Sequence, residues 1–315
     1  MRDMSERPLV EIVAELRAQL AAGARELSLL VLDPDRGRGR FAGERVVLGG
    51  RAHIHRPFRV WVDLAERLGL RLLTPRAHGE HLVELRMERL DAAATLAASA
   101  GDPEEDAARE RYGAGSLFSR ISRLDDPGLI LDLADALERA GTTADARVLA
   151  LGVNRGDELA LLEALVPGLA ERGSFVGVDH SASALARARE RFADPRHQFI
   201  EADLADLGDL GLGDFDLVIA ISTLQSPGVD DRALLRAVVH DHLRPGGALL
   251  LGIPNCRYVD GEQVHGARMK NFSQPELSLV IKEIAFYRRY LQQHRFQVFV
   301  TGKSYLLVTA VPRRG

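Results

Sequence analysis

The chain has 315 residues, of which 46% are hydrophobic and 27% are charged. This length exceeds what one hydrophobic core usually serves, so two domains are expected. The formal net charge of −4 argues against a surface coated in positive charge for bulk nucleic-acid binding. Cys256 is the only cysteine, which excludes an intramolecular disulfide and a cysteine-rich metal site, and we expect no bound metal.

The first ninety residues predict a small α/β domain. Apolar residues at helical spacing predict a helix over residues 8–23, and ELSLLVLD at 26–33 predicts a strand. A helix near Val60–Leu68 and two strand-like runs, RLLTP and HLVELRMERL, follow. We assign residues 1–90 to an accessory or substrate domain.

The N-terminus lacks the apolar segment of a signal peptide, and no apolar run reaches membrane-spanning length. We therefore expect a cytoplasmic protein without a membrane partner. Residues 91–115, rich in Ala, Gly and acidic residues, are predicted to form a linker. A homodimer is possible.

One stretch of the small domain is strongly basic. Residues 36–59 contain seven arginines and two histidines, His53 and His55, against a single acid, Glu44. Such a loop could bind phosphates through forked guanidinium contacts, which makes RNA a plausible partner. The alternative is a solvated basic loop.

Residues 116–315 predict a doubly wound, mostly parallel α/β sheet. A helix at Pro127–Ala140 precedes apolar strands that alternate with helical stretches. The five predicted strands are 146–152, 174–179, 197–203, 215–221 and 247–253. The closing segments FQVFV and YLLVTAV predict a β-hairpin.

Residues that suit a nucleotide-like ligand follow the first two of these strands. Gly152 and Gly156 bracket the turn into the next helix, where glycine lets the backbone pass close to a ligand. The second strand ends at Asp179, followed by His180, and a carboxylate there can accept hydrogen bonds from both ribose hydroxyls.

The next two strands also end in polar residues. Asp203 followed by Leu204 suits the amino group and the flat face of an adenine. Ser222 and Thr223 follow the fourth strand. All of these residues lie at the carboxyl ends of strands, where open parallel sheets bind their ligands.

The ordered set VLALGVNRGDEL, FVGVDHSASALARARERF, FIEADLADL, FDLVIAISTLQS and LRPGGALLLGIPN, with the final hairpin, resembles the class I (Rossmann-like) S-adenosylmethionine-dependent methyltransferase family over roughly Tyr112 to Pro312. The resemblance implies a seven-stranded sheet, S-adenosyl-L-methionine as cofactor, and in-line methyl transfer. It also implies the cofactor-binding residues Gly152, Val153, Asn154, Gly156, Asp179, His180, Asp203, Leu204, Ser222 and Thr223.

Two positions depart from the family pattern. Ala150 stands where an acidic residue is usual, and Asn154 stands where a glycine is usual. Asn tolerates a left-handed backbone better than other non-glycine residues, so Asn154 can preserve the turn. Asp157 and Glu158 are the candidates to replace the missing carboxylate.

The substrate side is expected in the long segment between the fifth strand and the hairpin. Lys270, one of only three lysines in the chain, is the first catalytic candidate, and His265 is the second. The substrate-binding candidates are Asn255, Tyr258, Arg268 and Tyr287. The alternatives are that Lys270 is an ordinary surface charge and that Tyr287 is a core residue.

The predicted function is methyl transfer to an O or N acceptor on a small molecule or an RNA nucleoside. An NAD-dependent oxidoreductase is an alternative, although Asp157 replaces the third glycine of the dinucleotide motif. A non-catalytic S-adenosylmethionine-binding protein is another.

Overall fold

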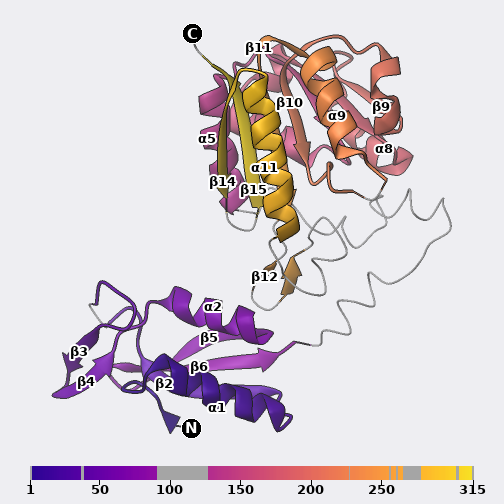
Figure 1. Cartoon of the computed structure of the whole chain (residues 1–315). Coiled ribbons are helices and arrows are strands. Elements are labelled where there is room, and N and C mark those ends of the chain that lie inside the picture. The colour runs from indigo at the N-terminus through magenta and orange to yellow at the C-terminus, as the bar shows by residue number, and fades with distance from the viewer. Residues whose placement is uncertain are drawn as a thin grey trace. The chain divides into compact units, whose positions relative to one another are not determined.

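The computed structural model describes residues 2–36, 39–90, 127–226, 228–254, 257–259, 262–264, 278–302 and 305–313. The chain divides into two compact units, and Figure 1 colours the chain by residue number from indigo at the N-terminus to yellow at the C-terminus. The N-terminal unit comprises Met1–Ala100 and Tyr258–Val264. The C-terminal unit comprises Gly101–Arg257 and His265–Gly315.

The N-terminal unit contains a four-stranded sheet in the order β1-β2-β6-β5. Its strands and helices are β1 (Arg2–Asp3), α1 (Leu9–Ala21), β2 (Glu26–Leu32), α2 (Phe58–Leu68), β5 (Leu70–His78) and β6 (Leu82–Arg89). Both helices share one core with the sheet, in which Ile12, Leu16 and Trp61 are fully buried. The predicted helices and strands of this segment are present.

A hairpin lies within the basic stretch, where the sequence indicated only a loop. Strands β3 (Arg45–Leu48) and β4 (Arg51–Ile54) pair in antiparallel fashion. Gly49 and Gly50 connect them with φ angles of 58° and 76°, which a two-residue hairpin turn of this kind requires. The adjacent Gly-Gly pair was the sequence signal for this turn.

The C-terminal unit contains a seven-stranded sheet in the order β14-β15-β11-β10-β7-β8-β9, in which only β15 is antiparallel to β11 and to β14. Its strands are β7 (Arg147–Leu151), β8 (Ser174–Asp179), β9 (Gln198–Glu201), β10 (Phe215–Ile221), β11 (Leu243–Pro254), β14 (Phe296–Gly302) and β15 (Tyr305–Pro312). The mostly parallel sheet and its terminal hairpin confirm the predicted fold class.

Helices cover both faces of this sheet (Figure 1). One face carries α5 (Pro127–Ala140), α6 (Asp157–Leu165), α7 (Leu169–Arg172) and α8 (Ala182–Arg191). The other carries the 3₁₀ helix Leu204–Leu210, α9 (Asp231–Ala237), the π-helix Val238–His242 and α11 (Ser278–Gln293). Successive strand residues alternate between the two cores, which explains the nearly continuous apolar runs in the sequence.

The strand order places a topological switch point at β7. The chain leaves β7 for β8 on one side, and later returns to place β10 on the other. Open α/β sheets bind ligands outside the carboxyl ends of the strands at such a point. None of the described helices has the length and hydropathy needed to cross a bilayer.

Candidate functional site at the carboxyl edge of the sheet

The loop after β7 begins with a glycine that the protein itself requires. Gly152 has a φ of 66°, and its N–H donates to the carbonyl of Val178 at 2.8 Å. A Cβ atom on Gly152 would lie 2.6 Å from Oγ1 of Thr223 and 2.9 Å from its Cγ2. The close approach that explains this glycine is therefore to Thr223 and not only to a ligand.

Thr223 connects the two strands at the switch point. It is buried, and its Oγ1 donates to the carbonyl of Leu151 at 2.7 Å. Since Leu151 ends β7 and Thr223 follows β10, this bond holds the two strand ends together. The Thr223 hydroxyl donates its proton in this bond, so its role is to hold the shape of the site.

The remaining members of the loop are buried or half-buried. Val153 is buried and fills the space above Gly177, where a Cβ atom would lie 2.7 Å from Val153 Cγ1. Gly156, with a φ of 80°, precedes α6. Asn154 adopts the left-handed conformation predicted for it, with a φ of 46°.

Asp179 joins the loops after β7 and β8. Only 6% of this residue is exposed. Its Oδ2 accepts from the N–H of Asn154 at 2.8 Å, and its Oδ1 accepts from the N–H of Ser181 at 2.9 Å. A carboxylate has about four acceptor sites, so these two bonds leave capacity for two more donors.

This arrangement fits the adenosyl cofactor that the resemblance implies. Vicinal ribose hydroxyls are a pair of donors, and Asp179 offers two open acceptor sites on a carboxylate that the backbone orients. The neighbouring His180 is exposed, with its Nδ1 3.8 Å from Asp179 Oδ1. Asp179 is therefore the residue of the predicted set whose geometry best suits a ligand.

Asp157 has a different role from the one suggested by the missing acid at position 150. Its Oδ2 accepts from Arg155 Nε at 2.8 Å, and its Oδ1 accepts from Arg191 Nη1 at 2.7 Å. Two guanidinium groups thus neutralise this buried carboxylate. The sequence analysis missed this cluster, because residues 157 and 191 come together only through the packing of α6 against α8.

Asp203 caps a helix. Its side chain is exposed and accepts from the N–H of Ala205 at 2.8 Å, at the start of the 3₁₀ helix Leu204–Leu210. Leu204 is half-buried and packs against the core on that face. The cap uses one acceptor site of Asp203, and the proposed adenine contact stays a prediction.

Ser222 is held in an uncommon conformation at the end of β10. Its φ is 62°, and its hydroxyl forms a hydrogen bond with the hydroxyl of Tyr305. Non-glycine residues with positive φ cluster at functional sites, where surrounding structure stabilises them. Tyr305 could have been found from the hairpin, because an antiparallel β15 must begin beside the carboxyl end of β11, at Pro254.

Tyr287 lies in the core of the face covered by α11. It is fully buried, and its hydroxyl donates to Asp231 Oδ2 at 2.7 Å. Burial, together with the neighbouring Asp231 carboxylate, raises the pKa of the Tyr287 phenol. This placement favours the core interpretation over a substrate contact.

The other substrate-side candidates lie outside the described residues. They are Asn255, His265, Arg268 and Lys270, together with the side chain of Tyr258, whose backbone belongs to the short strand β12 (Arg257–Val259). Their roles stay predictions.

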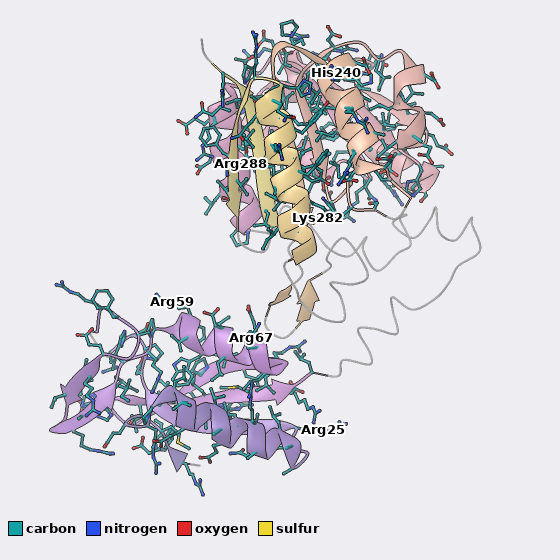
Figure 2. All side chains as sticks on the ribbon, in the orientation of Figure 1. Arg25, Arg59, Arg67, His240, Lys282 and Arg288 are labelled. Carbon is teal, nitrogen blue, oxygen red and sulfur yellow. The ribbon has the colours of Figure 1, made fainter. Side chains whose placement is uncertain are left out.

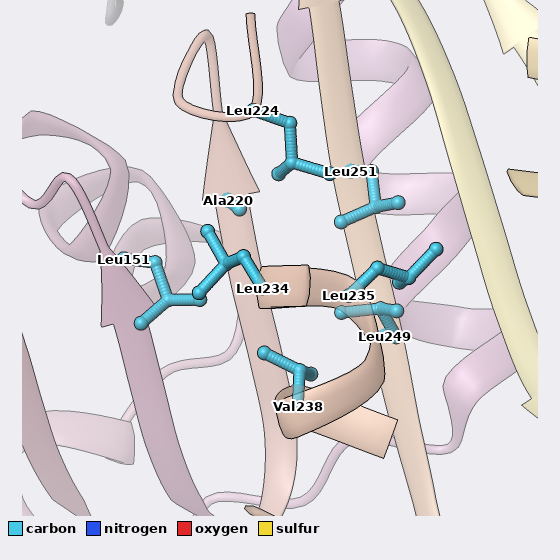
Figure 3. Close-up of a pocket in the computed structure, with 8 residues that line it drawn as sticks. All are labelled: Leu151, Ala220, Leu224, Leu234, Leu235, Val238, Leu249 and Leu251. Atoms are coloured by element: carbon cyan, nitrogen blue, oxygen red, sulfur yellow. The ribbon is translucent and has the colours of Figure 1, made fainter. Parts of the chain in front are cut away.

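A small cavity lies near the site, between α9 and the strands β7, β10 and β11 (Figure 3). It is lined by Leu151, Ala220, Leu224, Leu234, Leu235, Val238, Leu249 and Leu251. Because every lining residue is apolar, this cavity offers nothing for a charged amino acid or a ribose to bind. We interpret it as a gap in the packing beneath α9.

The residues at this edge of the sheet are similar in sequence to known methyltransferases. Residues 149–249 match the family model described as a methyltransferase domain. A trans-aconitate 2-methyltransferase of Deinococcus radiodurans is 33% identical over 35% of this chain, and a carboxy-S-adenosyl-L-methionine synthase of Shewanella loihica is 28% identical over 43%. The matches span 38% and 56% of the length of these two relatives.

A crystal structure of an S-adenosylmethionine-dependent methyltransferase from Aquifex aeolicus is also similar. It is 19% identical, and the match covers 62% of this chain and 98% of that one with a TM-score of 0.43. The family model runs from within β7 to within β11, and this range includes every predicted cofactor residue. Residues 149–249 of the C-terminal unit therefore match a methyltransferase domain.

Proposed function

We propose that this protein is an active methyltransferase that uses S-adenosyl-L-methionine to methylate a small molecule. The observation that carries the proposal is Asp179, whose carboxylate is oriented by two backbone N–H groups and keeps two acceptor sites open. It lies within the residues that match the methyltransferase domain. The bound cofactor would supply a methyl group activated by an adjacent sulfonium.

The chain's own residues have two tasks in holding the reactants. The loop from Gly152 to Gly156 and Asp179 would hold the adenosyl and methionine portions. The strand ends that Thr223 ties to Leu151 would keep the acceptor in line with the methyl carbon. The bound cofactor would supply the methyl group to the acceptor atom, and an acceptor that is not already ionised would give up its proton.

The residues on the substrate side of the site would have to assist removal of the proton from an acceptor that carries one. A hydroxyl or amine acceptor needs a base or a fixed cation nearby, and Lys270 and His265 stay the candidates for it. A carboxylate acceptor is already ionised at neutral pH and would need no base. The name of the Deinococcus relative makes a small carboxylic acid, with trans-aconitate as its example, the first acceptor to test.

The direct experiment combines binding with transfer. Titration of the full chain with S-adenosylmethionine, S-adenosylhomocysteine and NAD should show binding of the first two only. Labelled methyl transfer into cell extract, sorted into metabolites, RNA and protein, should then place the label in metabolites. Binding of NAD alone would overturn the proposal, and cofactor binding without label in any fraction would favour a non-catalytic binding protein.

A further inference from the structure

The N-terminal unit contains a buried arginine whose charge has no carboxylate partner in the described part of the chain. Arg56 lies between β4 and α2, and only 4% of the residue is exposed. Its Nη2 donates to the backbone carbonyl of Arg7. Its guanidinium carbon lies 5.5 Å from the centre of the Trp61 ring. The guanidinium therefore lies in the interior, between the N-terminal segment and α2.

Two hydrogen-bond donors in this place are unsatisfied. Arg56 Nη1 and Trp61 Nε1 are both buried, and neither has a hydrogen-bond partner among the described residues. Leaving a buried donor unpaired costs about 1–3 kcal/mol, and a buried unpaired charge costs more. Burial lowers the pKa of Arg56, yet arginine stays protonated at neutral pH. What is missing is an acceptor with negative charge.

The first turn of α2 adds to this positive environment. The helix has 11 residues, and its N-cap is Pro57, which makes no side-chain cap hydrogen bond. The first N–H groups of a helix have no partner within the helix and carry a partial positive charge. Trp61 is in this turn, and helical side chains lean toward the N-terminus, which brings its ring to the Arg56 guanidinium.

This turn is open to solvent. Phe58 is 43% exposed, and Arg59 is exposed beside it. Figure 2 shows Arg59 at the beginning of α2 and Arg67 at the other end of the same helix. Solvent therefore reaches the Phe58 and Arg59 side chains of this turn, whereas the Arg56 Nη1 and Trp61 Nε1 donors are buried.

Two other arginines of the basic stretch form ordinary ion pairs with carboxylates. Arg51 bonds to Asp3 at 3.2 Å and to Glu6 at 2.6 Å, and Arg36 lies 3.5 Å from Asp33. Surface ion pairs thus neutralise part of the positive charge of this stretch. Arg56 differs from them because it is buried and lacks such a pair.

We propose that Arg56, the Trp61 indole N–H and the first turn of α2 form a binding site for a small oxyanion, either a phosphate or a carboxylate group. Both oxyanions accept forked hydrogen bonds from a guanidinium and suit the N-terminus of a helix. A bound oxygen would satisfy the two orphaned donors and neutralise the buried charge. The site belongs to the N-terminal unit, so it does not depend on methyl transfer.

The test is anion binding by the full chain. Inorganic phosphate and acetate would be titrated separately at constant ionic strength, with binding followed by calorimetry. Tighter binding of phosphate would identify a phosphorylated ligand, and tighter binding of acetate a carboxylate ligand. Arg56→Gln should weaken binding at least tenfold, whereas Arg67→Gln, at the far end of α2, should leave it unchanged.

A second variant covers the case in which Arg56→Gln does not fold. Trp61→Phe keeps the aromatic ring but removes the N–H, and it should weaken anion binding about threefold or more. Affinity for S-adenosylmethionine should stay unchanged in both variants, which separates this site from the proposed function. The proposal is overturned if the native chain binds neither anion at millimolar concentrations, or if both variants bind as the native chain does.

Discussion

Buried charge is handled differently in the two units of this protein. In the C-terminal unit, Asp157 receives two guanidinium groups, and Asp179 receives two backbone N–H groups. In the N-terminal unit, Arg56 donates to one carbonyl and keeps Nη1 without a partner. These three are the buried Asp, Glu, Lys and Arg residues of the described chain.

The comparison separates three states of a buried charge. Asp157 is neutralised by the guanidinium groups of Arg155 and Arg191, so its role is structural. Asp179 is oriented and still has acceptor capacity, which is the condition for binding a ligand with precision. Arg56 has a buried N–H group without an acceptor, so binding of an anion would offset the free-energy cost of burying its charge. Burial alone therefore does not identify a site; whether groups of opposite charge already neutralise the buried residue does.

Removing the Asp179 carboxylate should have the largest effect. Asp179→Ala would remove the carboxylate to which the N–H groups of Asn154 and Ser181 donate, at a cost to the free energy of unfolding of about 2–4 kcal/mol. The dissociation constant for S-adenosylmethionine should also rise at least tenfold, or about 1.4 kcal/mol. Urea denaturation and calorimetry would measure the two effects.

The exposed Asp194 provides a matched control, because its partner is the surface side chain of Arg196. Asp194→Ala should leave cofactor affinity unchanged. An unaltered dissociation constant in Asp179→Ala would contradict the proposed contact between Asp179 and the cofactor. Asp179 would then have a structural role only, as Asp157 does.

Asp157→Ala should have an intermediate effect of a purely structural kind. Its removal leaves Arg155 and Arg191 without their shared partner, at a cost of about 1–3 kcal/mol, since both guanidinium groups keep some contact with water. Cofactor affinity should change less than threefold, because two guanidinium groups already pair with the Asp157 carboxylate. Glu190→Ala, which breaks the exposed pair with Arg187, is the control. A tenfold loss of affinity in Asp157→Ala would erase the distinction between Asp157 and Asp179.

The smallest effect concerns His197, a neutral buried group whose bonds are complete. Its Nδ1 accepts from the N–H of Phe175 at 3.2 Å, and its Nε2 donates to the carbonyl of Ala170 at 3.1 Å. Burial lowers the pKa of His197 from its usual 6.5. The unfolded chain therefore binds a proton more readily than the folded one, so this stability is present above pH 6.5 and is lost as the pH falls toward the folded pKa.

Urea denaturation of the native chain and of His197→Gln between pH 7.5 and pH 5 would check the sign. Stability of the native chain should fall more steeply toward acid than that of the variant. Parallel curves would show that His197 is not the titrating group.

Much of the C-terminal fold could be predicted from the chain, and less of its site. Apolar runs that alternate with helical stretches predicted five strands and the hairpin. Each strand of a parallel sheet covered on both faces is a nearly continuous apolar run in the sequence. The prediction for Asn154 also held, since a left-handed turn limits the residue types that fit. The contacts of Thr223 and Tyr305 were not predicted, because they join strands distant in sequence.

By itself, the sequence determined the order of the strands along the chain, the glycines of the turns and the acids at the strand ends. Each of these depends on local backbone geometry and on the pattern of buried residues, and both are visible in residues that are neighbours in the sequence. Only the tertiary structure decided which buried charges have partners, since Arg191 reaches Asp157 across 34 positions while Arg56 meets no carboxylate in the described chain. Satisfaction of a charge is a property of the groups that packing brings within about 3 Å, and chain order does not encode that distance.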